Sequence, residues 1–241
     1  MKKIPGRVLL VTVAAPAERK AVLRHAEGPL ESGAYCIQGT SFQVLETGIG
    51  PVNAAYKLGR WIGENKGRIR GVVNLGVAGG FDLNQLPLLS TVIVAREIWP
   101  EIGLRHGDRV DPCGIGLSMG SSPAGAVWDR IELEPAKNAA AMGIELPRKW
   151  PSVSGTTVAG VTGTLQGAER VHKAYPTDVE SMEGFALGWV CMQEEVPFVQ
   201  CRVISNRVGS REEWNLKGAL RELGEAGKQL LKSKKNGFSD D

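Results

Sequence analysis

Short apolar runs rich in β-branched residues alternate with longer amphipathic stretches along most of this 241-residue chain. The runs predict strands at residues 8–13, 43–47, 72–75, 91–95, 157–161 and 198–205. The amphipathic stretches predict helices at residues 52–65, 166–173, 182–195 and 213–231. This alternation is typical of an α/β fold, and we expect a single-domain three-layer sandwich with a mixed, mostly parallel central sheet flanked by helices. Such sheets bind ligands at the carboxyl ends of their strands.

The chain length suits one domain, which we place at residues 1–231, followed by a flexible polar tail at residues 232–241. The sequence has 29 Lys and Arg residues against 26 Asp and Glu residues, a net charge of only +3. Because the basic residues are spread along the chain except near its C-terminal end, we expect no nucleic-acid partner. No apolar run approaches the roughly 20 residues that span a bilayer, so we expect no membrane partner.

The N-terminus allows two interpretations. Lys2, Lys3 and Arg7 precede an apolar run, and Ala15-Pro16-Ala17 resembles the cleavage site of a signal peptide. The same run suits a buried first strand equally well, and the helical pattern that begins near Ala17 continues it as a strand–turn–helix unit. We favour the strand.

Cysteine and histidine spacing gives no metal motif and no disulfide framework. The residues concerned are Cys36, Cys113, Cys191, Cys201, His25, His106 and His172. They lack CxxC spacing, and the histidines lie far apart in the sequence. We therefore expect no metal, and free thiols in the reducing environment of the cytoplasm.

Residues 116–120, Gly-Leu-Ser-Met-Gly, fit the G-x-S-x-G nucleophile elbow of α/β-hydrolases. That elbow needs a strand before the serine and a helix directly after it, and the flanking Pro112 and Pro123 disfavour both. An esterase built on Ser118 is therefore a distant alternative. The surrounding segment 105–126 is rich in Gly, Ser and Pro, and is either a loop over a site or a surface excursion.

Two glycine-rich segments follow predicted strands. Residues 48–53 open a helix as a dinucleotide fingerprint would, but Asn53 replaces the third glycine and no acidic residue follows at the expected distance. Residues 76–80, Gly-Val-Ala-Gly-Gly, predict a turn where a flat ring or a sugar could approach the backbone. Either segment alone is also typical of an ordinary tight turn. Together they favour a binding site without a dinucleotide cofactor.

Two carboxylates, Glu180 and Glu183, fall at the start of a predicted helix. Acidic residues at this position often only offset the helix dipole. A fixed carboxylate can also accept hydrogen bonds from both hydroxyls of a ribose 2′,3′-diol, with Met182 as a soft apolar wall for the sugar. Both interpretations stay open on these residues alone.

The last predicted strand places Arg202 and Asn206 on one face. A buried arginine needs an anionic or polar partner, so Arg202 is either half of a structural ion pair or part of a site. Asn206 falls at the carboxyl end of the strand, where ligands bind.

Five segments together resemble the nucleoside phosphorylase/nucleosidase superfamily, in the order of that family and across residues 8–230. They are Thr47-Gly48-Ile49-Gly50, residues 74–80, Val161-Thr162-Gly163, residues 179–183 and residues 196–206. The chain is most similar to the methylthioadenosine/adenosylhomocysteine nucleosidase and futalosine hydrolase branches. The resemblance implies cleavage of the N-glycosidic bond between ribose and a purine through an oxocarbenium-like sugar. It also implies a homo-oligomer, and we expect no cofactor.

Carried over by position, the resemblance implies that Glu183 binds the ribose diol and that Met182 lines the sugar. Glu18 matches the acid that orients or activates water, and Arg202 matches an arginine near that water. The segment that flanks the base is matched by Thr162, Gly163, Leu165 and Gln166. The other expected substrate contacts are Gly50, Val77, Ala78, Gly79 and Glu180.

Two departures from the family narrow the expected reaction. Phosphorylases of the superfamily hold phosphate with an arginine after the first strand, where this chain has Ala14-Ala15-Pro16-Ala17-Glu18. Negative charge there would repel phosphate, which makes water the expected acceptor. Asn206 stands where adenine-specific nucleosidases have an aspartate, and its amide could meet a 6-oxo group and a protonated N7 together.

We therefore expect a nucleosidase acting on a 6-oxopurine nucleoside and water, with release of hypoxanthine from futalosine, a step in menaquinone biosynthesis, as the leading hypothesis. An adenine-specific or aminodeoxyfutalosine nucleosidase, a purine nucleoside phosphorylase and a non-catalytic nucleoside-binding protein stay open. The sequence does not fix the 5′ substituent, for which Arg105 and Arg109 are candidate partners of a substrate carboxylate.

Overall fold

The computed structural model describes residues 7–107 and 109–232. The strands of its central sheet are β1 (Val8–Val13), β2 (Tyr35–Ile37), β3 (Thr40–Glu46), β4 (Ile69–Gly80), β5 (Thr91–Ile98), β10 (Arg130–Glu132), β11 (Ser152–Thr157), β12 (Val179–Ser181) and β13 (Phe198–Arg207). Two small hairpins lie outside the sheet: β6 (Leu104–His106) with β7 (Arg109–Asp111), and β8 (Gly120–Ser122) with β9 (Gly125–Val127). The helices are α1 (Pro16–Val22), a 3₁₀ turn (Leu23–His25), α2 (Pro51–Glu64), α3 (Pro135–Ala141), α4 (Leu165–Ala174), α5 (Gly184–Gln193) and α6 (Leu216–Leu230).

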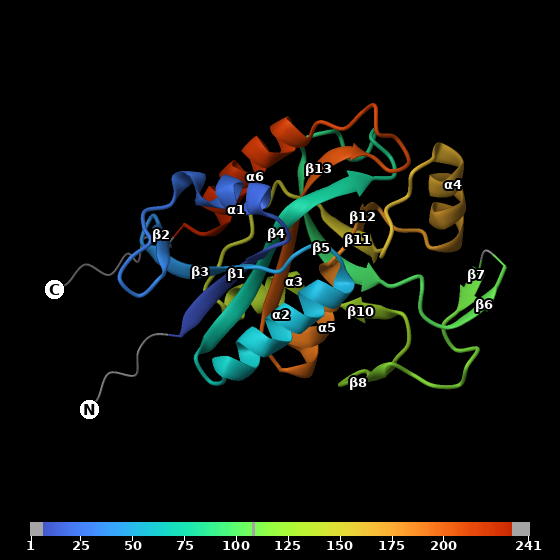
Figure 1. Cartoon of the computed structure of the whole chain (residues 1–241), viewed down its shortest axis with the longest axis horizontal. Coiled ribbons are helices and arrows are strands. Elements are labelled where there is room, and N and C mark those ends of the chain that lie inside the picture. The colour runs from blue at the N-terminus through green and yellow to red at the C-terminus, as the bar shows by residue number, and fades with distance from the viewer. Residues whose placement is uncertain (1–6, 108, 233–241) are drawn as a thin grey trace.

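The central sheet is mixed and has nine strands (Figure 1). Its main path runs β10–β5–β11–β12–β4–β1–β3–β2, and β13 pairs in parallel with β4 and antiparallel with β5. Because β5 also reaches β4 through β11 and β12, these five strands close into a ring. The ring brings side chains from distant parts of the sequence close together.

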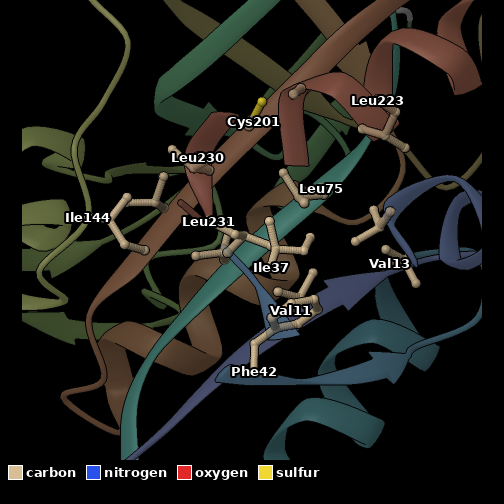
Figure 2. Close-up of a cluster of buried hydrophobic side chains, with 14 of the residues drawn as sticks. Val11, Val13, Ile37, Phe42, Leu75, Ile144, Cys201, Leu223, Leu230 and Leu231 are labelled. Atoms are coloured by element: carbon tan, nitrogen blue, oxygen red, sulfur yellow. The ribbon is translucent and has the colours of Figure 1, made fainter. Parts of the chain in front are cut away.

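Two hydrophobic cores cover the two faces of the sheet. On one face, Val11 of β1, Leu75 of β4 and Cys201 of β13 meet Leu223 and Leu230 of α6 (Figure 2). Helices α1 and α3 contribute to this core as well. Alternate residues of the same strands point to the opposite face, where α2 and α5 complete the second core. The expected arrangement of a sheet flanked by helices is therefore confirmed.

Most predicted elements are present, but several boundaries were wrong, three of them beside the cavity or in the strands next to it. Residues 76–80, predicted as a turn, continue β4, because they are hydrogen-bonded to β13 on one side and at Gly79 and Gly80 to β12 on the other. The strand predicted at 157–161 lies at 152–157, where its partners β5 and β12 set its position. The helix predicted at 182–195 begins at Gly184, because residues 179–181 form β12.

The α5 helix is also more completely buried than the amphipathic pattern of its sequence predicts. Phe185 and Ala186 are buried as expected, but Leu187 and Cys191 are fully buried too, and Trp189 is only half-buried. Because α5 packs against both the sheet and the neighbouring helix α2, it is covered on more than one side. None of the helices in the described ranges is long and apolar enough to cross a bilayer. Of the predicted tail, residues 233–241 lie outside the described residues.

Truncation of Leu223 tests the core between α6 and the sheet. We expect Leu223→Ala to lower the free energy of unfolding by about 2–5 kcal/mol, because it removes a fully buried side chain and leaves a cavity. The matched variant Leu117→Ala removes the same atoms from an exposed side chain and should cost less than about 0.5 kcal/mol. Denaturant unfolding measures both values, and equal losses would contradict the described packing.

Candidate active site

A cavity of about 450 Å³ lies at the carboxyl ends of β1, β4 and β13, the edge of the sheet where a ligand is expected. Its walls are completed by the β12–α5 junction, by the segment between β13 and α6, and by the first turns of α6. A second hollow of about 470 Å³ beside α1 contains none of the catalytic or substrate-binding residues that the sequence predicts. The first cavity is therefore the candidate site.

Glu18 forms part of the cavity wall and is itself buried. Helix α1 begins with Pro16, and Glu18, the third residue of that helix, folds back over its start. One carboxylate oxygen accepts from the backbone N–H groups of Ala14 (2.8 Å) and Ala15 (3.3 Å), and the other accepts from Val77 N–H (3.0 Å). Three backbone donors from two segments thus hold the carboxylate in one orientation.

Glu183 stands at the N-terminus of α5 and lines the cavity. Its Oε1 accepts from the backbone N–H of Gly50 at 3.0 Å. Gly48 and Gly50 have φ values of 80° and 91°, a region that glycine adopts without steric cost, and this turn aims the N–H at the carboxylate. Burial raises the pKa of Glu183, and the positive charge of Arg202 opposes that rise. The first glycine-rich segment therefore holds a side chain of the site.

Arg202 lies beneath the cavity and is almost completely buried. A Cβ atom built on Gly76 would overlap with Nη1 of Arg202 and would stand 3.0 Å from Oε1 of Glu18. The guanidinium and this carboxylate therefore pack against the same glycine. Within the described ranges, Nε and Nη2 of Arg202 have no hydrogen-bond partner. The second glycine-rich segment thus makes room for a buried cation.

Glu180 of β12 is hydrogen-bonded to Thr162, the first residue of the segment that the sequence predicts to flank the base. Its carboxylate accepts from the backbone N–H of Thr162 at 2.9 Å and from the hydroxyl of Thr162 at 2.5 Å. Burial raises the pKa of Glu180. Both residues line the cavity, so this interaction fixes one of its walls.

Asn206 lines the cavity at the end of β13. Its Oδ1 accepts from the hydroxyl of Ser205 at 2.8 Å, and its Nδ2 donates to the carbonyl of Arg207 at 2.7 Å. An amide has two acceptor sites and two N–H donors. One acceptor site and one N–H of Asn206 are therefore left for a ligand, in an orientation that the neighbouring residues set.

Most of the residues that the sequence predicts for the site meet at this cavity. Those in its lining are Glu18, Val77, Ala78, Gly79, Thr162, Glu180, Met182, Glu183 and Asn206. Gly50 and Arg202 contact the site from outside its lining, as described above. Gly163, Leu165 and Gln166 do not line the cavity, although they lie within four residues of Thr162.

The structure adds Arg211 and Trp214, which sequence reasoning missed. Both line the cavity, with the Arg211 guanidinium 5.2 Å from the centre of the Trp214 ring. They lie in a polar segment before α6 that carries no motif. Arg105 and Arg109, which the sequence suggested as partners of a substrate carboxylate, lie on the exposed β6–β7 hairpin. None of residues 105–107 and 109–126 lines the cavity. In the described chain this segment is a surface excursion.

Another missed residue is Glu97 of β5, which is fully buried close to the cavity. Its Oε1 accepts from Nε2 of Gln200 at 2.6 Å, and its Oε2 accepts from the Thr157 hydroxyl at 2.8 Å. Burial raises the pKa of Glu97 to about 7, against the opposing effects of these hydrogen bonds and of Arg202. The sequence gives no sign of this residue, since Glu97 stands in a strand without a motif.

Residues 5–233 match the family model of the Phosphorylase superfamily, and the chain belongs to this family. A futalosine hydrolase of Thermus thermophilus is 29% identical over 201 residues, which cover 81% of this chain and 83% of the relative. A 5′-methylthioadenosine/S-adenosylhomocysteine nucleosidase of Colwellia psychrerythraea is 30% identical over 186 residues, covering 72% and 70%.

Solved structures share the fold. The Colwellia psychrerythraea nucleosidase in complex with adenine has a TM-score of 0.67 at 23% identity, and the match covers 94% of this chain and 97% of that one. A futalosine hydrolase mutant of Helicobacter pylori has a TM-score of 0.65 at 17% identity, covering 92% and 98%.

The buried acids predict how stability depends on pH. Between the ordinary pKa of a glutamic acid, 4.5, and the value of about 7 in the fold, folded Glu97 keeps a proton that the unfolded chain has released. We therefore expect the free energy of unfolding to fall as the pH rises through this window, with Glu180 and Glu183 acting in the same direction. Denaturant unfolding at about pH 5 and about pH 8 measures the fall. Glu97→Gln should show a smaller fall, and identical falls in both proteins would contradict the buried placement of Glu97.

Proposed function

We propose that this protein is a nucleosidase that hydrolyses the N-glycosidic bond of a 6-oxopurine nucleoside, with futalosine as substrate and hypoxanthine as the released base. The observation that carries the proposal is the charge of the cavity lining. Three carboxylates, of Glu18, Glu180 and Glu183, line the cavity, and Arg211 is the one Lys or Arg side chain among the described lining residues. The relatives named as futalosine hydrolase and nucleosidase support the same class of reaction.

An acidic lining favours water over phosphate as the acceptor. The carboxylate of Glu18 occupies the backbone N–H donors of Ala14 and Ala15 that follow β1, and its charge repels a phosphate dianion at this position. The same carboxylate can accept a hydrogen bond from a water molecule and take its proton as that water attacks. Arg202 beneath Gly76 offsets part of the negative charge of Glu18 and Glu183.

Glu183 is suited to the ribose. One of its oxygens accepts from Gly50 N–H, and the remaining acceptor sites can bind the 2′,3′-diol, with Met182 as the apolar wall beside it. In cleavage of a glycosidic bond, positive charge develops on the sugar ring. A carboxylate fixed beside that ring stabilises the transition state more than the ground state.

Asn206 is suited to a 6-oxopurine. Its free N–H can donate to the 6-oxo group, and its free acceptor site can receive the proton of a protonated N7. Because an amide does not release a proton, the proton that the leaving base needs comes from solvent in this proposal. Loss of hypoxanthine is then assisted by hydrogen bonding.

The second candidate is an adenine-specific nucleosidase, which the Colwellia psychrerythraea relative favours. A product assay separates the candidates: futalosine, methylthioadenosine and inosine are each incubated with the protein, with and without phosphate. We expect hypoxanthine from futalosine and no ribose 1-phosphate. Release of adenine from methylthioadenosine without turnover of futalosine would favour the second candidate, and a requirement for phosphate would favour a phosphorylase. Binding without turnover would indicate a non-catalytic nucleoside-binding protein.

Replacement of Glu183 tests the role of its charge. We expect Glu183→Gln to lower kcat/KM by roughly 10²–10³, because a neutral amide stabilises a cationic sugar less well and is a poorer acceptor for two hydroxyls. The control Glu194→Gln makes the same change at an exposed position at the other end of α5 and should leave kcat/KM unchanged. Unchanged kinetics in a folded Glu183→Gln protein would remove this residue from the reaction.

Replacement of Asn206 tests the choice of base. We expect Asn206→Asp to shift the ratio of kcat/KM values from 6-oxopurine toward 6-aminopurine nucleosides, because a carboxylate accepts from an amino group but has nothing to donate to an oxo group. The new oxygen also faces the carbonyl of Arg207, so the ratio is more informative than either value alone. Asn84→Asp, on an exposed loop, is the matched control. Equal losses on both nucleosides would leave Asn206 a structural role only.

A further inference from the structure

A buried polar cluster lies beneath the N-terminus of α5. It consists of Glu97, Thr157 and Gln200, which come from β5, β11 and β13, three strands of the closed ring. The Glu97 carboxylate accepts from both of the other side chains, and all three residues are buried. The carboxylate also lies close to Gly155, where an added Cβ would stand 2.6 Å from Oε1. The cluster is therefore closely packed as well as hydrogen-bonded.

The cluster is connected to the start of α5 by two contacts. The Thr157 hydroxyl, which donates to Glu97, accepts from the backbone N–H of Phe185 at 2.7 Å. A Cβ atom on Gly184 would overlap with Oε1 of Glu97 and would stand 2.7 Å from the side-chain oxygen and nitrogen of Gln200. Since Gly184 and Phe185 directly follow Glu183, the cluster supports the backbone that carries the Glu183 carboxylate.

The charges around Glu97 come from the site. Arg202 on β13 attracts its negative charge, and Glu183 on α5 repels it. A carboxylate buried without an ion pair of its own destabilises a protein relative to an apolar residue that fills the same space. The fold therefore gains little from an acid here, whereas the catalytic groups directly above gain a fixed support.

We propose that Glu97 is a positioning residue for hydrolysis, which holds the N-terminus of α5 through Thr157 and so fixes the Glu183 carboxylate in the cavity. The proposal rests on the assignment of Glu183 to the ribose made above. A catalytic group displaced by about 1 Å loses much of its effect, so a support of this kind affects the rate without touching the substrate.

The hydrogen-bond pattern specifies which protonation state of Glu97 performs this role. Both carboxylate oxygens accept, which matches the ionised form, whereas a protonated carboxyl must use one oxygen as a donor. Burial raises the pKa of Glu97 to about 7, so the ionised form is lost as the pH falls through this value. The groups that face it are Arg202 and Glu183, as described, together with Thr157 and Gln200. Hydrolysis should therefore decline below about pH 7 in part through Glu97.

Four variants test this role by steady-state kinetics on the nucleoside that the product assay identifies, with melting temperatures measured alongside. Glu97→Gln replaces one of the two accepting oxygens with an NH₂ group, so this side chain can no longer accept from both Thr157 and Gln200. Thr157→Val removes the connecting hydroxyl, and Thr157→Ser keeps it. Glu132→Gln makes the same change as Glu97→Gln at an exposed position on the neighbouring strand β10.

We expect Glu97→Gln and Thr157→Val to lower kcat/KM by about 10- to 100-fold, mainly through kcat, in folded protein. Glu97→Gln should also lack the decline below about pH 7 that is due to Glu97. Thr157→Ser should recover most of the rate, and Glu132→Gln should match the unaltered protein in both rate and pH profile. A purely structural role would lower the melting temperature without changing kcat or the pH profile.

Glu97→Gln and Thr157→Val proteins that fold and keep the rate and pH profile of the unaltered protein would overturn the proposal. If Glu97→Gln does not fold, the two Thr157 variants decide between the outcomes. A lower kcat/KM in Thr157→Val that is recovered in Thr157→Ser supports the proposal. Equal kcat/KM values in these two variants overturn it. A fully active Glu183→Gln would instead refute the ribose assignment. An impaired Glu183→Gln beside unaffected Glu97 and Thr157 variants would refute the positioning role alone.

Discussion

The buried guanidinium of Arg202 is the constraint on which the site depends. A charge so completely removed from water destabilises a protein unless negative charge surrounds it. Glu18 packs against Gly76, the same glycine that Arg202 contacts. The negative charges of Glu97 and Glu183 both interact with the positive charge of Arg202. The three acids come from α1, β5 and the start of α5. The guanidinium of Arg202 therefore lies among acidic side chains from three separate elements.

This arrangement sets the chemistry that the cavity can support. Acids near the cavity are held on backbone N–H groups or on neutral side chains, which fixes their orientation without cancelling their charge. The lining is therefore anionic, which suits a substrate that becomes positively charged at the sugar and disfavours phosphate as a second substrate. Burial raises the pKa values of Glu97, Glu180 and Glu183, that of Glu97 to about 7, so these acids take up protons at a higher pH than exposed glutamates do.

The closed ring of strands explains how the site is assembled. Pairing of β13 with both β4 and β5 places Gln200 and Arg202 beside residues that precede them by more than 100 positions. The short strand β12 joins β11 to β4 in this ring and ends at Ser181, two residues before Glu183. Because α5 begins shortly after β12 ends, the ring sets the position of the Glu183 carboxylate, although Glu183 itself lies outside the strands of the ring.

Much of the fold could be predicted from the sequence. The alternation of apolar runs and amphipathic stretches predicted the α/β class, most of the elements and the end of the sheet where the cavity lies. Resemblance to a family, carried over by position, also predicted nine of the residues in the cavity lining. These features are local in sequence, since periodicity and motif spacing are set by neighbouring residues.

Tertiary structure alone decided what each of these residues contacts. The glycines at positions 76–80 have the composition of a turn, yet pairing with β12 and β13 keeps them in a strand, where Gly76 makes room for Arg202. Glu97, Arg211 and Trp214 carry no sequence signal, because burial beneath α5 and placement at the cavity wall depend on chain segments far away. The sequence by itself therefore determined the elements and the types of residue at the site. Their partners, burial and pKa values were decided by long-range strand pairing, which brings together groups that no local pattern connects.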